Sequence, residues 1–414
     1  MKLCMVTTFY PPYHFGGDAT YIHRLAAELG RRGHSVDVVH DLDAYYLLHP
    51  GDPSLDYPPL DNVTVHRLKS PVGFLSPLAT HQTGFPLFKP RLRRLLTSGG
   101  HDVVHFHNAS LIGPGAFGFG SGVKLYTTHE QWLVCPMHLL WQFGRRVCET
   151  RRCFRCCLLG RRPPQFWRAT GLLRRRVRQI DRFLAPSRFV RDKHREWGLD
   201  LPTSVLPYFL PDAPPAGPDD GPPHPRPYFL FVGRLERIKG LHTILGSFRR
   251  LGSADLVVAG EGTNDPDLRA AAAGMLNVTF LGAQPYERLR ALYRHAIAVV
   301  VPSVCYEVFP MVILEAFAEA TPVVARDLSG MAEAVSDSGG GLLFRDDADL
   351  RAALDRLRAD SGLRRALGDA GRRSFLERWT ADAHVRQYLG IVEACREARA
   401  SSRRALGVAP AEAV

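Results

Sequence analysis

The sequence predicts an α/β protein made of two doubly wound domains that face each other across a cleft. With 414 residues and 45% hydrophobic content, the chain exceeds what one typical core needs. Apolar, strand-like runs alternate with helical stretches in both halves, and a stretch rich in Pro, Asp and Gly separates the two series. Because such sheets bind ligands at the carboxyl ends of their strands, a site is expected in the residues that follow each run.

The first half of the chain alternates strands with helices. Its strand-like runs are rich in Val, Phe and Tyr and read "KLCMVTTF", "SVDVVH", "DVVHFHN", "VKLYTTHE" and "DRFLAPS". A helix over residues 19–32 repeats apolar residues on one face and stops at Gly33. We expect a first domain at residues 1–206, with a Cys- and Arg-rich insert at about 131–178.

The second half repeats this pattern after a linker expected at residues 207–227. Its runs are "YFLFVGR", "ADLVVAGEG", "VTFLGA", "IAVVVPS", "PVVARD" and "GGLLFRD". They predict a second domain at residues 228–385. The Arg- and Ala-rich residues that follow, 386–414, predict a helix and tail that return toward the first domain, with "GVAPAEAV" frayed at the end.

The composition limits which cellular compartment and which classes of binding partner are expected. No apolar stretch approaches the roughly 18–20 residues that span a bilayer, and Pro11 and Pro12 end an N-terminal apolar run too short for a signal peptide. A cytoplasmic chain is therefore expected. The net charge of +12 favours anionic partners such as phosphates, acidic lipid or nucleic acid, although the Arg-rich composition alone also raises the charge.

Two strand exits carry residues suited to phosphate. "FGGDAT" places Gly16 and Gly17 before the first helix, where free amides attract an anion, and Asp18 is expected to cap that helix. "VGRLERIKG" places Arg234 and Lys239 after the first strand of the second domain, and cations there suit a diphosphate. A tight turn and a pair of solvated charges are the plain structural alternatives.

Two further strand exits belong to the same rim of the second sheet. "AGEG" holds Gly260 and Glu261, and "FLGAQ" holds Ala283. Both combine small residues with exposed backbone groups, so they could line a pocket for a nucleotide base. Ordinary turns would have the same composition.

The segment "CYEVFPMVILEAF" puts two acids, Glu307 and Glu315, around a helix N-terminus. Pro310 suits the first helical position, and the helix ends before Pro322. Carboxylates beside an anion site can accept hydrogen bonds from neutral hydroxyls, and a nucleotide sugar has hydroxyls on both sides of its diphosphate. The face expected to be buried holds Ile313, Ala316, Phe317 and Ala320.

The E-x7-E pair formed by Glu307 and Glu315, together with "AFAEATPVVA", "GRLERIK" and "FGGDAT", resembles the family 4 glycosyltransferases. The resemblance covers essentially the whole chain. It implies the GT-B fold and a retaining hexosyltransferase that uses a nucleotide sugar of UDP or GDP type, without a catalytic metal. Polysaccharide or glycolipid synthesis is the expected setting.

The resemblance also implies roles for individual residues. Glu307 would contact the donor sugar and Glu315 the ribose, while Arg234 and Lys239 would bind the diphosphate and stabilise it as it leaves. The other implied donor contacts are Gly16, Gly17, Gly260, Glu261, Ala283, Phe309, Pro310, Met311 and Val312.

One further role and one departure follow from the same resemblance. His129 in "TTHE" matches the family's active-site histidine, and we expect it to position the donor rather than to act as a general base. The acceptor hydroxyl would attack from the leaving-group face. Pro310 departs from the Gly that many members have, which removes one amide donor from the loop.

The insert contains a candidate metal site. Cys135, Cys148, Cys153 and Cys156 include one C-x2-C step, and in a reducing compartment this pattern suits a structural zinc ion. His138 could replace one thiolate. Buried free thiols are the alternative interpretation.

The insert is also strongly basic. Twelve arginines lie between Arg145 and Arg178, with Glu149 as the one acid among them. Aromatic residues lie between the charges, so this surface could rest on the anionic inner face of a membrane or bind an anionic acceptor. The acceptor could be a glycan, a lipid or a small molecule. The aromatic residues are Trp141, Phe154, Phe166 and Trp167.

Two other functions fit parts of the same pattern. A nucleotide-sugar 2-epimerase would share the fold, but it would need further acid and base groups and no acceptor. A non-catalytic protein could bind nucleic acid or another anion through the basic insert. Because all five of the main implied site residues are present, we expect an enzyme and no nucleic acid. These residues are His129, Arg234, Lys239, Glu307 and Glu315.

Overall fold

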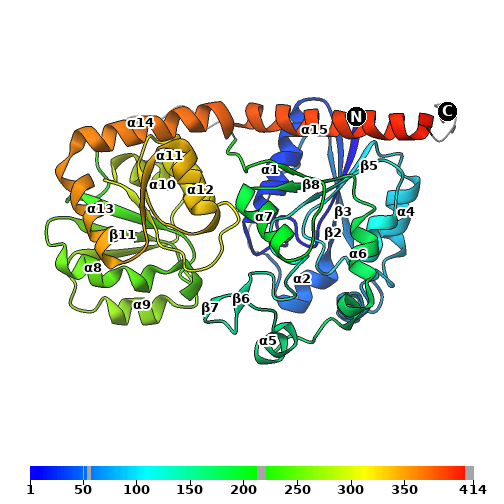
Figure 1. Cartoon of the computed structure of the whole chain (residues 1–414), viewed down its shortest axis with the longest axis horizontal. Helices are drawn as coiled ribbons and strands as arrows, with labels where there is room; N and C mark the ends of the chain where they lie inside the picture. The colour runs from blue at the N-terminus through cyan, green and yellow to red at the C-terminus, as the bar shows by residue number, and fades with distance from the viewer. Residues whose placement is uncertain (50, 54–56, 212–220, 406–414) are drawn as a thin grey trace.

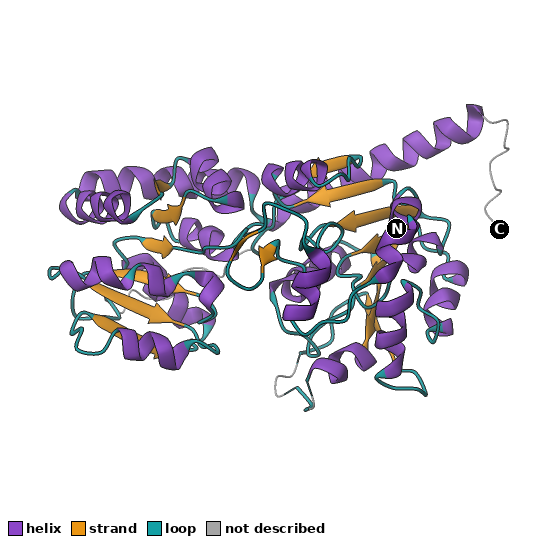
Figure 2. Cartoon of the chain, turned by 60° about the horizontal axis from the view of Figure 1, so that its bottom comes forward, coloured by secondary structure: helices purple, strands orange, loops and turns teal. Residues whose placement is uncertain are grey.

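The computed structural model describes residues 1–49, 51–53, 57–211 and 221–405. Two parallel sheets lie side by side, each with helices on both faces, and the C-terminal helices run along both (Figures 1 and 2). This confirms the predicted fold class. Part of the predicted linker, residues 212–220, and the tail, residues 406–414, lie outside the described residues.

The first sheet has seven strands in the order β3-β2-β1-β4-β5-β8-β9, and all its pairs are parallel. All five predicted runs form strands, whereas β3 and β9 were missed. Strand β3 is mostly exposed and mixes apolar with polar residues, and β9 has only 3 half-buried residues, so neither has a continuous apolar run. The strands are β1 (Lys2–Val6), β2 (Ser35–Asp41), β3 (Val63–Leu68), β4 (Val103–Phe106), β5 (Val123–Thr127), β8 (Arg182–Ala185) and β9 (Thr203–Val205).

The second sheet has six strands in the order β12-β11-β10-β13-β14-β15, again all parallel. Each one forms at a predicted run. The strand order reverses between β10 and β13, and in the first sheet between β1 and β4, so each sheet has one switch point where a ligand can bind. The strands are β10 (Tyr228–Val232), β11 (Asp255–Ala259), β12 (Val278–Gly282), β13 (Val299–Val301), β14 (Val323–Arg326) and β15 (Gly341–Phe344).

The helices of the first domain follow the predicted pattern with one correction. Gly16 caps α1 with extended backbone, whereas Asp18 lies inside the first turn and does not cap the helix. The Asp18 carboxylate instead accepts a hydrogen bond from Asn108 at 3.1 Å. The helices are α1 (Gly17–Arg31), α2 (Leu42–Leu48), α3 (Leu75–Thr83), α4 (Pro90–Ser98), α5 (Cys153–Leu159), α6 (Leu172–Val177) and α7 (Arg188–Glu196).

The helix between the two acids, α11 (Met311–Ala318), also differs slightly from expectation. Pro310 is its N-cap rather than its first residue. Ala320 is exposed with a φ of 55°, because the helix has already ended, and Leu314 is buried in its place. The other helices of the second domain are α8 (Leu245–Arg250), α9 (Asp265–Ala271), α10 (Tyr286–His295), α12 (Ser329–Ser338) and α13 (Asp347–Ala359).

The last two helices connect the domains. Helix α14 (Ser361–Arg378) packs on α11 and α12, and α15 (Ala381–Ala405) packs on α1 and β5 of the first domain. Buried Tyr388 and His384 fix α15 in place, since the Tyr388 hydroxyl lies 3.2 Å from His105 and His384 lies 3.0 Å from the Tyr21 hydroxyl. Helix α15 therefore lies along the first domain (Figure 1).

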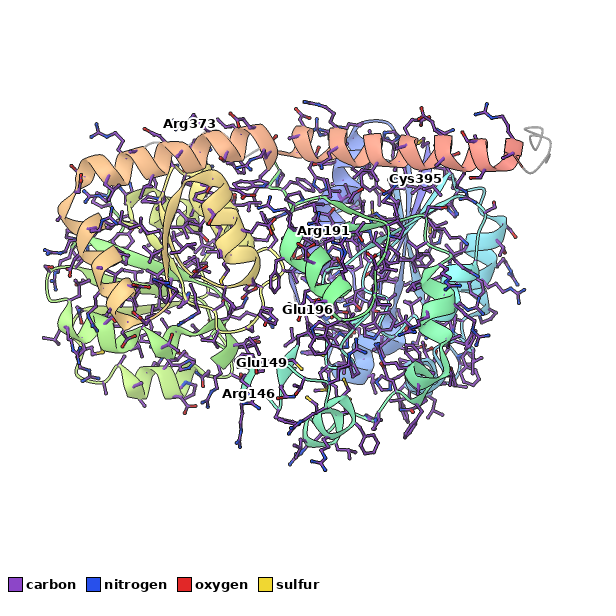
Figure 3. The ribbon with its side chains drawn as sticks, viewed as in Figure 1. Arg146, Glu149, Arg191, Glu196, Arg373 and Cys395 are labelled. Carbon is purple, nitrogen blue, oxygen red and sulfur yellow. The ribbon has the colours of Figure 1, made fainter. Side chains whose placement is uncertain are left out.

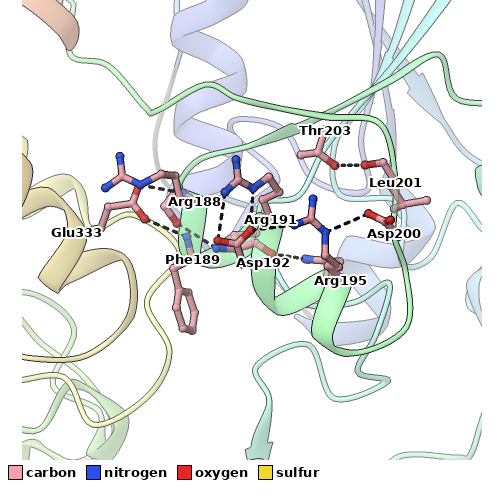
Figure 4. A network of polar contacts seen from close by, with 12 residues as sticks. Arg188, Phe189, Arg191, Asp192, Arg195, Asp200, Leu201, Thr203 and Glu333 are labelled. Atoms are coloured by element: carbon pink, nitrogen blue, oxygen red, sulfur yellow. Dashed lines mark hydrogen bonds and ion pairs between the residues drawn. The ribbon is translucent and has the colours of Figure 1, made fainter.

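A polar clamp joins the domains at the N-terminus of α7 (Figure 4). The amides of Arg188 and Phe189 each donate to the Glu333 carboxylate on α12 at 2.9 Å. The Arg188 guanidinium forms two hydrogen bonds with Asp337, at 2.7 and 2.8 Å. The Ser187 hydroxyl donates to the carbonyl of Val308 at 2.8 Å. This clamp holds the loop that carries Glu307 against the first domain.

We expect the double substitution Glu333→Gln/Asp337→Asn to favour a more open arrangement of the domains. It removes the charge from hydrogen bonds of a type that contributes about 1.5–3 kcal/mol each. Small-angle scattering of the ligand-free protein should show a larger radius of gyration. The control is Asp355→Asn on α13, whose carboxylate is exposed. Identical scattering from the double variant and the parent would contradict this role.

Candidate active site

The exits of β10 and β13 bring Lys239 and Glu307 together. The Lys239 ammonium donates to Glu307 Oε1 at 2.7 Å, and the Ser303 hydroxyl donates to the same oxygen at 2.8 Å. The amide of Glu307 donates to the Ser329 hydroxyl at 3.0 Å. The exits of β10 and β13 therefore fix the carboxylate, and the start of α12 (Ser329–Ser338) fixes the backbone of the same residue.

The electrostatics of this pair favour two charged groups. Burial alone would raise the pKa of Glu307, but the charge of Lys239 and the bonds from Lys239 and Ser303 lower that pKa below its ordinary value. Burial lowers the pKa of Lys239, but Glu307 more than compensates and leaves it raised. The pair is thus ionised at neutral pH.

Arg234 adds a second cation to the same edge of the sheet. Its guanidinium is exposed and pairs with Glu236 at 2.8 Å. Its charge helps to lower the pKa of Glu307. The same charge acts to lower the pKa of Lys239. The two predicted cations therefore lie near each other, with Arg234 free to turn toward a ligand.

Glu315 lies on α11 and faces different partners. The Tyr293 hydroxyl on α10 donates to Glu315 Oε2 at 2.6 Å. Burial raises the pKa of Glu315, while the Tyr293 bond and the charge of Arg24 lower it in part. Since Arg24 lies on α1 of the first domain, Glu315 is within electrostatic reach of that domain.

The exits of β10, β11 and β12 are joined through their backbones. Gly260 has a φ of 144°, and a Cβ there would lie 1.9 Å from the carbonyl oxygen of Gly233, so only glycine fits. The amide of Leu235 donates to the Glu261 carbonyl at 2.8 Å, and the amide of Ala283 donates to the Glu261 carboxylate at 3.2 Å. Three of the predicted pocket residues thus form one continuous rim.

The loop before α11 reaches the domain junction. Phe309 is buried, with its ring 6.3 Å from that of Tyr208 and 5.9 Å from that of Trp379. Pro310 is buried, and Met311 and Val312 are half-buried at the start of the helix. A pocket of about 330 Å³ opens at this junction among residues that include Phe309, Trp379 and Arg188; its lining does not include Glu307 or Lys239.

His129 follows β5 in the first domain and is fully engaged by protein partners. Its Nδ1 lies 2.8 Å from the Tyr208 hydroxyl and its Nε2 lies 2.9 Å from His107. Burial lowers the pKa of His129 to about 4, although the nearby charge of Asp18 opposes the shift. The ring is therefore neutral at pH 7, and Tyr208 links it to Phe309 on the opposite domain.

The glycine pair of the first domain lies at the switch point beside β1. A Cβ at Gly17 would have no atom within 4 Å, so the space above this residue is open to a ligand. At Gly16 a Cβ would lie 3.2 Å from the Asp18 carboxylate. Gly16 and Gly17 therefore border a free space at the start of α1.

The candidate zinc ligands lie in one region without forming a ready-made metal site. Among the residues that the structure describes, no three His, Cys, Asp or Glu side chains are arranged to hold an ion. His138, the alternative ligand, is bonded instead to Glu130.

Four residues that touch this site were missed from the sequence: Arg24, Tyr208, Tyr293 and Ser303. Ser303 had a usable signal, because it is the last residue of the strand run "IAVVVPS". Arg24, Tyr208 and Tyr293 reach the site only through packing between helices or between domains, and no local pattern marks them.

Two doubly wound domains, with paired acids and cations at the strand exits between them, define a glycosyltransferase of the GT-B fold. Family models confirm this: residues 15–212 match Glycosyltransferase Family 4, and residues 218–374 match Glycosyl transferases group 1. The chain belongs to the family 4 glycosyltransferases and is an enzyme of that class.

Curated relatives agree with this class. Glycogen synthase of Mycobacterium tuberculosis is 29% identical over 397 residues, which cover 86% of this chain and 85% of that protein. D-inositol 3-phosphate glycosyltransferase of Nocardia farcinica is 37% identical over 158 residues, 34% of this chain. That match spans only 35% of the Nocardia protein.

Solved structures share the fold across both domains. Sucrose-phosphate synthase from Thermosynechococcus elongatus has a TM-score of 0.70 at 21% identity and covers 96% of this chain and 99% of its own. The Anabaena protein HepE in complex with UDP has a TM-score of 0.67 at 16% identity and covers 95% of this chain and 100% of its own. In the part of the chain that the structure describes, no helix is long and apolar enough to cross a membrane.

We expect Lys239→Met to destabilise the protein by about 2–4 kcal/mol at pH 7, because it leaves the Glu307 carboxylate buried without its cation. The lowered pKa of Glu307 means that its contribution to stability is present above its unfolded pKa and is lost as pH falls through the folded one. The deficit should therefore shrink in acid, as Glu307 becomes protonated.

Denaturant unfolding at neutral and acid pH measures this difference. Arg237→Met is the matched control, since Arg237 lies in the same short helix but is exposed. An equal deficit at both pH values would show that Lys239 supports the fold through packing and not through charge.

Proposed function

We propose that this enzyme is a retaining glycosyltransferase that moves a sugar from a nucleotide-sugar donor of UDP or GDP type to a glycan, lipid-linked or small-molecule acceptor. The observation that carries the proposal is the Lys239–Glu307 pair, with Arg234 beside it, at the switch point of the second sheet. A structural neighbour crystallised with UDP supports the donor class. Residues 1–206 would form the acceptor side, and residues 228–385 the donor side.

In this proposal the donor diphosphate binds between Arg234 and Lys239. A phosphate at this position competes with Glu307 for the Lys239 ammonium, so donor binding frees a Glu307 oxygen to accept from a sugar hydroxyl. Gly17 borders open space at the start of α1, where helix amides favour an anion from the other side. The ionised state of Glu307 suits the role of acceptor.

The remaining donor contacts follow from the same orientation. Glu315 would accept hydrogen bonds from the ribose through one carboxylate oxygen, while the Tyr293 hydroxyl donates to the other, Oε2. The rim of Gly260, Glu261 and Ala283 would border the base. The loop from Phe309 to Val312 would contact the sugar and phosphate, with Pro310 unable to donate an amide.

The proposed chemistry needs no catalytic metal, because two cations already stabilise the departing diphosphate. The acceptor hydroxyl attacks from the face that the diphosphate leaves, and its proton passes to the leaving phosphate oxygen. His129 is neutral and bonded through both ring nitrogens, so it positions neighbouring groups and does not remove a proton.

We expect substitutions of Glu315 and Glu307 to have different effects on nucleotide binding and on turnover. Glu315→Ala should weaken nucleotide diphosphate binding by about 1.5–3 kcal/mol, the range for a charge-assisted bond. Glu307→Gln should lower turnover without weakening free nucleotide binding, because Glu307 binds the sugar and competes with the diphosphate for Lys239.

A thermal-shift screen of nucleotide sugars first selects the donor. Calorimetry then measures nucleotide affinity, and initial rates measure turnover. Glu287→Gln, on the exposed face of α10, is the control. Equal loss of nucleotide affinity in both variants would show that the two roles are assigned wrongly.

We further propose that the insert rests on an anionic membrane surface, where a lipid-linked acceptor would be held. Around α5, Phe154 and Leu159 are 56% and 71% exposed, and Arg152 and Arg155 are exposed beside them. Such a combination of apolar and basic side chains is typical of interfacial helices. Trp167, expected to lie on this surface, is instead buried in the domain core.

We expect vesicles containing anionic lipid to bind the protein reversibly, and rising salt to weaken the binding. Arg152→Ser/Arg155→Ser should weaken it about 10- to 30-fold, since each arginine near such a surface contributes about 1 kcal/mol. The control with equal charge change is Arg365→Ser/Arg373→Ser on α14, on the other domain (Figure 3). Co-sedimentation measures this; no binding at low salt would contradict the proposal.

A further inference from the structure

The Cys-rich insert folds as a compact unit around four thiols. Cys135 precedes a short hairpin of β6 (Trp141–Gln142) and β7 (Arg146–Val147), Cys148 directly follows that hairpin, and Cys153 and Cys156 lie one turn apart on α5. The amide of Cys148 donates to the carbonyl of Leu140 at 2.7 Å, which closes the hairpin onto the segment after Cys135. The labels Arg146 and Glu149 in Figure 3 locate this unit at the edge of the first domain that faces the second.

The four thiols are mutual neighbours. Each of Cys135, Cys148, Cys153 and Cys156 interacts electrostatically with each of the other three. Cys135 and Cys148 also share one apolar cluster with buried Leu140. Four cysteines from three separate segments thus lie in one small region, although in the described residues no three of them are yet spaced as metal ligands.

One backbone amide is directed at these sulfurs. The amide of Phe143, in the turn between β6 and β7, donates to Cys156 Sγ at 3.4 Å. This bond ties α5 to the hairpin, so the two cysteines of α5 lie beside the segment between Cys135 and Cys148. The Cys148 thiol itself donates to the Thr150 carbonyl at 3.4 Å.

A guanidinium group lies near the thiols. Arg168 lies against the rings of Trp132 and Trp167 and donates to the carbonyls of Trp132 and Leu133. It has no carboxylate partner among the described residues, and its Nε donates to the Gln165 side chain at 2.6 Å. A zinc ion with four thiolates carries a net charge of about −2 and would complement this guanidinium.

The loop between the first two cysteines is strained for its size. His138, Leu140 and Phe143 are non-glycine residues with φ values of 73°, 48° and 55°. The apolar cluster beside this loop has three buried members among the described residues, Cys135, Leu140 and Trp197. So small a core cannot fix such a backbone by apolar burial alone, and small units of this type are usually held by a metal or a disulfide.

We propose that Cys135, Cys148, Cys153 and Cys156 bind one structural zinc ion. Binding must draw the four sulfurs closer, because no three ligands yet have the geometry of a metal site in the described residues. His138 is excluded as a ligand by its bond to Glu130, and Cys157 points to the buried side of α5.

The proposed ion would brace the domain junction. The thiol cluster packs on Trp197 at the end of α7, and Tyr306, next to Glu307, packs on the same cluster. Arg151 donates to the Trp197 carbonyl and lies over its ring at 5.5 Å. Zinc binding itself does not depend on the proposed sugar transfer, so the two proposals can fail separately.

The test is metal analysis of the full chain, purified under reducing conditions without added metal. We expect about one zinc per chain, and after exchange with cobalt the intense visible bands of a tetrahedral tetrathiolate site. Cys148→Ser and Cys153→Ser should each lower zinc below about a tenth of an equivalent. Cys157→Ser and Cys395→Ser, which change thiols outside the proposed set, should retain it.

Each other outcome overturns the proposal. Substoichiometric metal in folded wild-type protein, even after incubation with zinc, would leave a cluster of free thiols. Fewer than eight free thiols in the metal-free protein would indicate a disulfide. Iron in place of zinc, or loss of zinc from Cys157→Ser, would show that the metal or its ligand set is assigned wrongly. The cobalt spectrum of the unmodified chain keeps the test valid if a variant fails to fold.

Discussion

The ion pair between Lys239 and Glu307 is the interaction on which the donor side of this enzyme depends. A half-buried cation and carboxylate are stable only if their remaining bonds are satisfied, which requires loops from separate strands to meet. Gly240 makes this meeting possible: it has a φ of 74°, and a Cβ there would lie 2.1 Å from the carbonyl oxygen of Pro302. The exits of β10 and β13 therefore touch, and the cation and the acid meet where the strand order reverses.

The same loop connects the donor side to the first domain. Val308, next to Glu307, accepts from Ser187, and Phe309 packs on Tyr208, which is bonded to His129. Glu315 feels the charge of Arg24 on α1. Because each acid or its neighbour has a partner on the opposite domain, any rotation of the domains must alter the surroundings of both acids. Domain arrangement and donor geometry are thus coupled through direct contacts.

The sequence predicted the fold because the fold follows from local patterns, and the same patterns suggested the candidate site residues. Long apolar strands can be recognised in the sequence. Because the strands are parallel, the residues that follow them all lie at one edge of the sheet. The failures have physical causes: β3 is mostly exposed and has no continuous apolar run, and Ala320 follows a helix that ends two residues earlier than its apolar period suggests. Arg24 and Tyr293 enter the site through tertiary packing, which no local spacing encodes.

The buried histidines of the first domain bear on the proposed chemistry. Burial lowers the pKa of His105 and His107 well below its ordinary value and that of His384 to about 3. With His129 they form a chain of neutral rings, joined by hydrogen bonds and ring contacts to Tyr21 and Tyr388. A base in such surroundings would have to gain a charge that the site is built to exclude. In the proposed reaction the acceptor proton must therefore go elsewhere, and the leaving phosphate oxygen, beside two cations, is the group whose growing charge best accommodates it.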